Sequence, residues 1–130
     1  MTILDTYCKA GGASRGYAEA GFQVVGVDIE PQPNYPFPFI QADAVEFIRK
    51  NGKDFDAIHA SPPCQKFSCS TGSHRKAGKS YPDLIEPTRK ALEATGKPFI
   101  MENVSQAPLR HDLILMGHMF NLWVIRKRIF

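Results

Sequence analysis

Residues 2–28 read TILDTYCKAGGASRGYAEAGFQVVGVD, and the fold prediction rests on this stretch. Residues 2–7 favour a strand, the small residues 10–12 favour a turn, and residues 14–20 favour a helix. Gly21 stands where a helix commonly ends in a left-handed conformation. Residues 23–28 favour a second strand that ends on Asp28. The stretch therefore predicts a strand–helix–strand unit, the building block of a parallel sheet.

The rest of the chain continues this alternation. Four prolines in residues 31–38 predict an extended connector. Further strands are expected at residues 39–41, 55–60, 98–103 and 123–130, and helices at 44–50, 84–95 and, as a short one, 111–120. Within 84–95, Pro87 marks either a kink or the true start. The polar, basic residues 67–81 predict a mobile loop. The sequence thus predicts one α/β domain over residues 1–130, an open, mostly parallel Rossmann-like sheet with helices on both faces.

Composition narrows the function classes only a little. The net charge of +3 permits contact with nucleic acid without arguing for it. The three cysteines are an odd number, and no signal peptide or membrane-length apolar run is visible, so we expect free thiols and a cytoplasmic protein without a membrane partner.

The candidate functional residues follow the predicted strands. In open parallel sheets, ligands bind beyond the carboxyl ends of the strands. Residues 5–12, Asp28, Asp43, Cys64 and residues 102–103 all stand at or just past such ends. The first turn does not match a dinucleotide fingerprint, but Asp28 is placed to accept hydrogen bonds from ribose hydroxyls. These features together favour an adenosine-type ligand of another kind.

Four segments carry a family resemblance. They are DTYCKAGG (5–12), PPCQ (62–65), ENV (102–104) and RKR (126–128). Their order and types resemble the DNA cytosine C5-methyltransferases, and the short members in phages and bacteria most of all. The resemblance covers nearly the whole chain, and its specific part is Pro-Pro-Cys-Gln followed about forty residues later by Glu-Asn-Val. It implies a catalytic domain that uses S-adenosylmethionine and acts on DNA, in a bacterial cell or a phage-infected host.

The resemblance also implies roles for individual residues. Asp28 would hold the cofactor's ribose, Ile29 would lie against its adenine, and Asp43 would meet the adenine amino group. The remaining cofactor contacts would come from Asp5, Tyr7, Cys8, Lys9, Ala10, Gly11, Gly12 and Pro62. Tyr7 stands where the family usually has phenylalanine.

For the cytosine, the resemblance implies that Cys64 is the nucleophile and that Glu102 binds the ring-nitrogen side of the base. Arg126 and Arg128 match two arginines that hold the catalytic loop and the carbonyl oxygen of the base. Further contacts to the substrate would come from Pro63, Gln65, Ser68 and Asn103. Residues 66–80 would form a lid in which Lys66, Arg75, Lys76 and Lys79 meet phosphates.

These residue types suit the chemistry. C5 of cytosine is a poor nucleophile until a thiolate adds at C6, and a thiolate can also leave afterwards. The charge that develops on the ring needs an acid, which Glu102 can supply if enclosure raises its pKa. The two prolines hold the backbone extended and thereby direct Cys64 toward the base.

Simpler interpretations compete for single residues. A zinc site from Cys64, Cys69, His74 and His59 is conceivable. Its ligands lack the paired spacing of common zinc sites, and it ranks behind the role of Cys64 as a nucleophile, so no metal is expected. Cys8 is expected to be a buried small residue and Cys69 a loop residue. His111 and His118 are expected at or near the surface, and Trp123 in the core.

Two departures from the family pattern keep a second function open. Lys9 replaces a glycine, where its side chain either crowds the cofactor or turns to solvent. The family also continues past the arginine motif into a target-recognition region, so a missing C-terminal segment or a second chain would have to supply recognition. A degenerate module that binds DNA or protein without catalysis therefore remains the alternative to an enzyme, and methylation of free cytosine nucleotides is a weaker third possibility.

Overall fold

The computed structural model describes residues 1–68, 80–124 and 126–130. In chain order its elements are β1 (Thr2–Thr6), α1 (Gly12–Glu19), β2 (Gln23–Asp28), β3 (Phe39–Gln41), α2 (Ala44–Asn51), the 3₁₀ helix η1 (Gly52–Asp54), β4 (Ala57–Ala60), α4 (Ile85–Thr95), β5 (Phe99–Met101), β6 (Asn103–Val104), β7 (Ile114–Met116), the 3₁₀ helix η3 (Gly117–Phe120) and β8 (Lys127–Ile129). None of the helices in this described part of the chain is long and apolar enough to cross a membrane.

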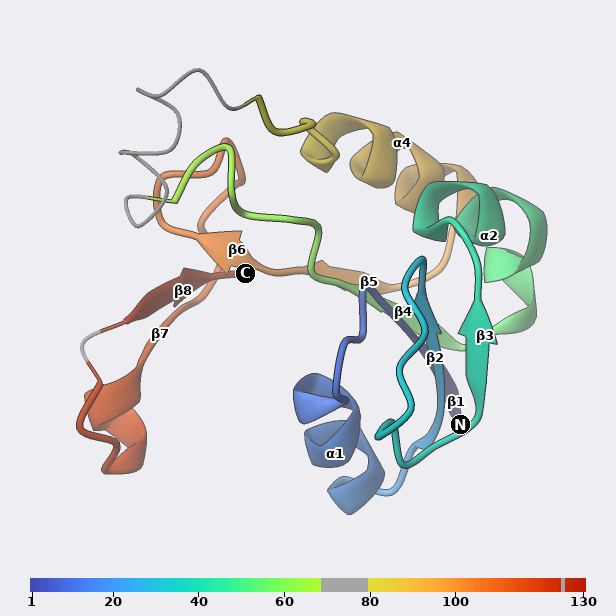
Figure 1. Ribbon diagram of the computed structural model, residues 1–130, viewed down its shortest axis with the longest axis horizontal. Helices are drawn as coiled ribbons and strands as arrows, with labels where there is room; N and C mark the ends of the chain where they lie inside the picture. The colour runs from blue at the N-terminus through green and yellow to red at the C-terminus, as the bar shows by residue number, and fades with distance from the viewer. Residues whose placement is uncertain (69–79, 125) are drawn as a thin grey trace.

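A five-stranded parallel sheet in the order β3-β2-β1-β4-β5 forms the centre of the molecule. Helix α1 covers one face and α2 with α4 cover the other, which confirms the predicted fold class (Figure 1). The chain moves outward from β1 to β2 and then returns to β4 on the opposite side of β1. The carboxyl ends of β1 and β4 are therefore a topological switch point, where such sheets bind ligands.

The core consists of the apolar side chains that the strands and the inner helix faces share. Leu4, Val27, Ile58, Ile48 and Leu92 have at most 1 % of their surface exposed. Central parallel strands covered on both faces require such apolar runs. Glycines adopt positive φ at two helix ends: Gly21, as predicted, at 91° and Gly96 at 68°.

Several boundaries differ from the sequence prediction for identifiable reasons. Helix α4 begins at Ile85, so Pro87 lies in its first turn, where a missing N–H costs no hydrogen bond. The strand predicted over residues 98–103 is divided at Glu102, because Asn103 and Val104 pair with β8 in a second, antiparallel sheet.

The C-terminal part differs from the prediction in three respects. Residues 111–120 hold strand β7 and the short helix η3, so the helix predicted over the whole stretch is wrong. Strand β8 covers only Lys127–Ile129 of the predicted 123–130 and pairs with both β6 and β7. Trp123 is fully exposed, so its predicted place in the core is also wrong. His111 and His118 are exposed, as predicted.

One glycine in the sheet has a steric role. Gly26 on β2 lies under the ring of Tyr35, a buried residue from the proline-rich connector whose hydroxyl is 2.7 Å from Ser14 Oγ. A β-carbon at position 26 would overlap the ring. The connector is thus packed against the sheet at this point.

We expect Gly26→Ala to lower the free energy of unfolding by roughly 1–3 kcal/mol, because overpacking displaces the Tyr35 ring and its hydrogen bond. Urea denaturation measures the change. The matched control is Gly16→Ala in α1, where a β-carbon would meet no described atom outside its own helix. The control is expected to gain roughly 0.5–1 kcal/mol from helix propensity. Equal stability of the two variants would contradict the packing argument.

Candidate functional site

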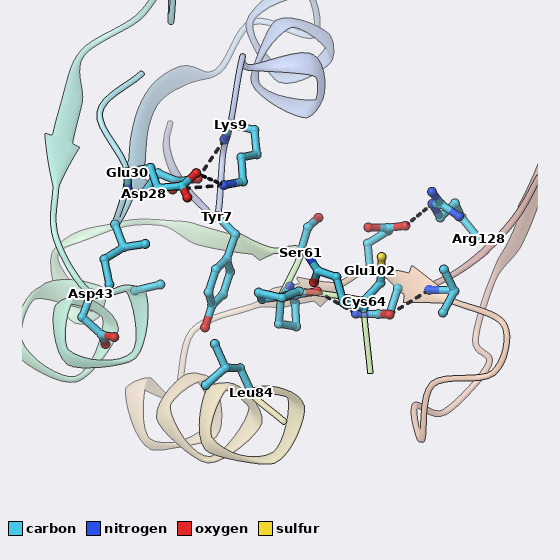
Figure 2. Close-up of a pocket in the computed structure, with 17 residues that line it drawn as sticks. Tyr7, Lys9, Asp28, Glu30, Asp43, Ser61, Cys64, Leu84, Glu102 and Arg128 are labelled. Atoms are coloured by element: carbon cyan, nitrogen blue, oxygen red, sulfur yellow. Dashed lines mark hydrogen bonds and ion pairs between the residues drawn. The ribbon is translucent and has the colours of Figure 1, made fainter. Parts of the chain in front are cut away.

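A pocket of about 380 Å³ lies at the carboxyl ends of β1, β2, β4 and β5. Its walls bring together most of the predicted site residues, from segments far apart in the sequence (Figure 2). The lining residues are Tyr7, Lys9, Asp28, Ile29, Glu30, Asp43, Ala44, Ser61, Pro62, Pro63, Cys64, Gln65, Leu84, Glu102, Asn103, Val104 and Arg128. Asp28, Glu30 and Asp43 gather at one end, and Cys64 lies with Glu102 at the other (Figure 2).

The carboxylate end is organised around Asp28, which is buried at the last position of β2. Its oxygens accept backbone N–H groups from Lys9, at 3.1 Å, and Glu30, at 3.0 Å. The Lys9 ammonium turns away from the turn to bind Glu30, at 2.7 Å, and lies 3.6 Å from Asp28. The Lys9 side chain is 63 % exposed but also lines the pocket, so the structure does not select one of the two predicted outcomes for Lys9.

Tyr7 forms the middle of the pocket. Its hydroxyl is 2.7 Å from Thr88 Oγ1 on α4, and in Figure 2 its ring extends between Asp28 and Leu84. This hydrogen bond requires a tyrosine rather than a phenylalanine, and it fixes the ring against α4. Ile29, which is 64 % exposed, offers a second apolar surface at the same end.

The turn after β1 rests on a buried polar network. Ser14 on α1 donates a hydrogen bond to Asp5 and also contacts the Tyr35 hydroxyl. Burial raises the pKa of Asp5 to about 6, against the opposing effect of the Ser14 hydrogen bond. Asp5 and the buried Cys8 line a second cavity of about 340 Å³, together with Tyr7, Ala13, His59, Ser61, Glu102, Arg128 and Phe130. The two cavities share Tyr7, Ser61, Glu102 and Arg128.

The glycine turn itself lies beside these cavities. Ala10, Gly11 and Gly12 are not among the residues that line either of them. Gly11 has φ 87° and precedes the first residue of α1, and a β-carbon there would press on Tyr35 and Pro36. Tyr7 and Lys9 also have positive φ, at 60° and 47°, a conformation that side chains disfavour by roughly 1–2 kcal/mol.

The thiol end is held by a buried asparagine. Asn103 Nδ2 donates to the carbonyl of Pro62 at 2.8 Å, and Asn103 Oδ1 accepts the N–H of Val104. Beyond Cys64 the chain turns, since the N–H groups of Phe67 and Ser68 both donate to the Cys64 carbonyl. Cys64 is half-buried and faces the pocket. The stretch PPCQ is therefore anchored on both sides of its cysteine.

Glu102 and Arg128 lie beside Cys64 (Figure 2). The Glu102 N–H donates to the Ala60 carbonyl, and the register of β6 with β8 brings Arg128 alongside, with Nε 2.7 Å from Glu102 Oε1. The contact is an ion pair rather than an aligned hydrogen bond, since no described group donates to this buried oxygen. Burial raises the pKa of Glu102, and Arg128 and a hydrogen bond from Ser61 oppose the rise.

Ser61 lines the site although the sequence analysis did not assign it, and His59 was named there only as a possible zinc ligand. Ser61 lines both cavities, and His59 Nε2 is 2.8 Å from its hydroxyl. Tyr17 on α1 contacts the other ring nitrogen of His59, also at 2.8 Å. The position of Ser61 directly after a strand was a signal that could have identified it. Because both ring nitrogens are engaged, His59 is a poor zinc ligand.

Other predicted residues fall outside the pocket. Arg126 is exposed and lines neither cavity, and Ser68 lines neither as well. Lys66 pairs with Asp83, at 2.8 Å. Arg75, Lys76, Lys79, Cys69 and His74 lie outside the described residues, so the lid prediction is not tested. Among the residues that are described, no group of three or more metal-binding side chains is placed to hold an ion.

The comparisons with known proteins agree with this geometry. The family model of the C-5 cytosine-specific DNA methylases matches residues 1–113. The type II methyltransferase M1.HphI of Haemophilus parahaemolyticus is 31% identical over 126 residues, which are 82% of this chain and 33% of the relative. M.AquIA of Picosynechococcus is 30% identical over 78% of this chain and 48% of its own length. The chain thus spans only about a third to a half of these relatives.

Solved structures support the fold. The Dnmt2 methyltransferase of S. pombe superposes with a TM-score of 0.66 at 17% identity, over 98% of this chain and 47% of that one. A hypothetical protein of Thermus thermophilus gives a TM-score of 0.63 at 12% identity, over 98% and 72% of the two chains. At such identities the likeness concerns the fold alone.

We expect Lys9→Gly to leave the free energy of unfolding unchanged or to raise it by up to roughly 2 kcal/mol. The substitution relieves a left-handed lysine, worth roughly 1–2 kcal/mol, and removes exposed ion pairs worth roughly 0–1 kcal/mol. Thermal and urea denaturation measure the result, with Glu30→Gln as a control that removes only the ion pair. A loss above about 1 kcal/mol in Lys9→Gly would mean that the ion pairs dominate.

Proposed function

Since the chain belongs to the family of C-5 cytosine-specific DNA methylases, we propose that it forms the catalytic part of a DNA cytosine-5 methyltransferase. The reaction would move a methyl group from S-adenosylmethionine to C5 of a cytosine flipped out of DNA. One observation carries the proposal: Cys64 and Glu102 share a pocket that has Tyr7 in its middle and Asp28 at its other end. A reactive thiol, an acid and a nucleoside-sized cavity are thereby adjacent.

The carboxylate end fits the adenosine part of the cofactor. Two backbone N–H groups hold the Asp28 carboxylate in place, so its remaining lone pairs can accept ribose hydroxyls. The Tyr7 ring and the exposed Ile29 side chain offer apolar surfaces for adenine. Asp43 caps α2 through the N–H of Glu46 and lines the same pocket, where it would meet the adenine amino group.

The second cavity adjoins the first at Tyr7, Ser61, Glu102 and Arg128, which line both. Asp5 and Cys8 line it near the start of α1, and Glu102 and Arg128 line it on the other side. We assign the methionine part of the cofactor to this space, which would direct its sulfonium toward the cytosine. When bound, S-adenosylmethionine supplies an electrophilic methyl group.

The Glu102–Arg128 pair matches the edge of cytosine. That edge presents an amino donor, a ring nitrogen that accepts a proton, and a carbonyl oxygen. A protonated Glu102 can donate to the ring nitrogen and accept from the amino group, while a guanidinium donates to the carbonyl. The burial that raises the pKa of Glu102 favours the form with the proton.

Cys64 would then add through sulfur to C6, and Glu102 would stabilise the electron-rich ring. C5 would take the methyl group, lose its proton, and the Cys64–C6 bond would break as the thiolate leaves. In duplex DNA, extruding the base first costs a few kcal/mol. Target recognition would come from a further segment or a second chain, because the chain spans at most about half of the curated relatives it matches. We assign the whole domain to the cytoplasm of a bacterial or phage-infected cell.

The second candidate is a module that binds DNA or protein without catalysis. The contact that favours it is the Lys9 ammonium, 3.6 Å from Asp28, which competes with ribose for that carboxylate. The pair is exposed on the lysine side and therefore weak, so we rank this candidate second. The same assay separates the two functions.

We expect the chain, supplied with S-adenosylmethionine and any partner that it needs, to form a covalent adduct with DNA that contains 5-fluorocytosine. The adduct persists because fluorine at C5 blocks the final elimination. Denaturing electrophoresis detects it as a shifted band. Cys64→Ser should abolish the band, and Cys69→Ser, a matched loss of another thiol, should retain it. A band that survives in Cys64→Ser would refute the assigned nucleophile, and no band with any DNA would favour the binding module.

We expect Glu102→Gln to slow adduct formation roughly 10²–10⁴-fold, since the amide keeps the shape but cannot deliver a proton. Single-turnover rates with labelled DNA measure the change. Glu93→Gln on α4 is the control for an exposed carboxylate outside the pocket. Similar rates in the two variants would remove Glu102 from the mechanism.

A further inference from the structure

Trp123 lies on the surface among other apolar side chains, between the paired strands β7 and β8. We call residues 119–124 the hairpin tip, and Figure 1 shows this part of the chain extending away from the five-stranded sheet. The exposed apolar side chains of the tip, each at least 43 % exposed, are Met119, Phe120, Leu122, Trp123 and Val124. Apolar surface concentrated in one short segment marks an interaction site.

The tip is held in shape by its own backbone. The Leu122 N–H donates to the Gly117 carbonyl at 3.1 Å, and the Val124 N–H donates to the Leu122 carbonyl at 2.8 Å. Asn121 ends η3 in a left-handed conformation, with φ 55°. Gly117 has no room for a β-carbon, which would overlap the Val124 carbonyl. The apolar side chains are therefore presented on a turn of defined shape, which lowers the entropy cost of binding.

The region around the tip also carries the net positive charge of the chain. Residues 113–130 hold three of the 16 cationic side chains and none of the 13 acidic ones, so the other residues are neutral in sum. Arg128 pairs with Glu102. Arg126 and Lys127 are exposed, and no described acidic side chain forms an ion pair with either of them. Unpaired cations beside exposed aromatic rings suit nucleic acid, which combines phosphates with flat bases.

Strand β8 connects the tip to the candidate site. Arg128 lines both cavities, and Lys127 and Arg126 precede it on the side of the tip. Trp123 stands five positions before Arg128, a stretch that spans at most about 17 Å. At about 3.4 Å for each phosphate of one strand, this length corresponds to roughly five nucleotides. DNA that leaves the pocket along β8 would therefore meet the tip.

We propose that the hairpin tip is a second DNA contact, in which the Trp123 ring stacks on a base beside the target cytosine while Arg126 and Lys127 contact phosphates. The position of the cytosine rests on the function proposed above. DNA is favoured over another polyanion because the chain belongs to a family of DNA methylases. An aromatic ring stacks on every base, so the tip adds affinity without sequence preference.

The fluorescence of Trp123 tests the contact directly, because this residue is the only tryptophan of the chain. We expect cytosine-containing DNA, single-stranded or duplex, to quench the emission as it binds, since stacked bases quench an indole ring. The anisotropy of labelled DNA follows binding in parallel. DNA that binds without changing the emission would overturn the proposal. Emission that changes with protein concentration alone would also overturn it, because a second copy would then cover the tip.

Two variants at one position measure the stacking. Trp123→Ala should weaken DNA binding roughly 5- to 150-fold, the equivalent of 1–3 kcal/mol for one stacked base. Trp123→Phe is the matched control, which keeps a flat ring and should lose much less affinity. The side chain is fully exposed, so thermal unfolding should be the same in both variants and the unaltered chain. Equal losses of affinity in the two variants, or no loss in Trp123→Ala, would contradict stacking.

A salt titration tests the phosphate contacts. Lys127→Gln should reduce the slope of log affinity against log salt concentration by about one, as expected for one lost phosphate contact. The control is Lys53→Gln, which removes an exposed lysine of η1 just before β4 and should leave the slope unchanged. The same slope in both variants would remove Lys127 from the DNA contact.

DNA length and Cys64→Ser separate this proposal from the catalytic one. Quenching should be complete with roughly five nucleotides on one side of the cytosine and should be lost when that side is removed. Equal quenching after trimming either side would contradict the position of the tip. Cys64→Ser should retain the quenching, because stacking needs no adduct. Quenching without an adduct in the unaltered chain supports the tip and rejects the enzyme, whereas an adduct without quenching rejects the tip alone.

Discussion

The parallel pairing of β1 with β4 is the constraint on which the rest of the site depends. Thr6 stands opposite Ala60 at the carboxyl ends of the two strands, so the chain leaves both strands at the same edge of the sheet. The segment that follows β1 carries Tyr7 and the glycine turn, and the segment that follows β4 carries Ser61 and Cys64. A slip of one residue in the pairing would turn every side chain of a strand to the other face of the sheet. The apolar core therefore fixes the register, and with it the distance between the segments that follow β1 and β4.

The pairing of β5 adds the second requirement. Because Met101 lies opposite Ala60, Glu102 emerges beside Ser61, and the chain then enters another sheet where β8 delivers Arg128. The break between β5 and β6 therefore has a function: a continuous strand would place residue 102 in a ladder rather than at the pocket. Asn103, buried and bonded to the carbonyl of Pro62, ties this break to the cysteine loop. Two sheets thus meet where the proposed acid and nucleophile stand.

The sequence predicted local structure well and long-range pairing less well. The bounds of β2 and β3 were predicted to the residue, because alternating apolar patterns and flanking turn residues are local signals. Residues 111–120 were misjudged, because a short apolar run fits either helix or strand until its partner is known, and β8 lies more than ten residues away. Most of the site was predicted through the resemblance. Ser61 was missed and His59 was considered only as a possible zinc ligand, because the His59 partner Tyr17 is 42 positions distant and only the fold reveals the contact.

The balance at Glu102 decides whether the site can serve as an acid. Removing a carboxylate from water penalises its charged form, whereas a guanidinium at 2.7 Å and a hydroxyl donor favour that form. Burial has the larger effect, so the pKa rises, but the two opposing groups limit the rise. A carboxyl without them would hold its proton too firmly to release it, and one without burial would rarely carry a proton at neutral pH. Arg128, from the second sheet, and Ser61, from the end of β4, therefore set the acidity of Glu102 from opposite sides of the same pocket.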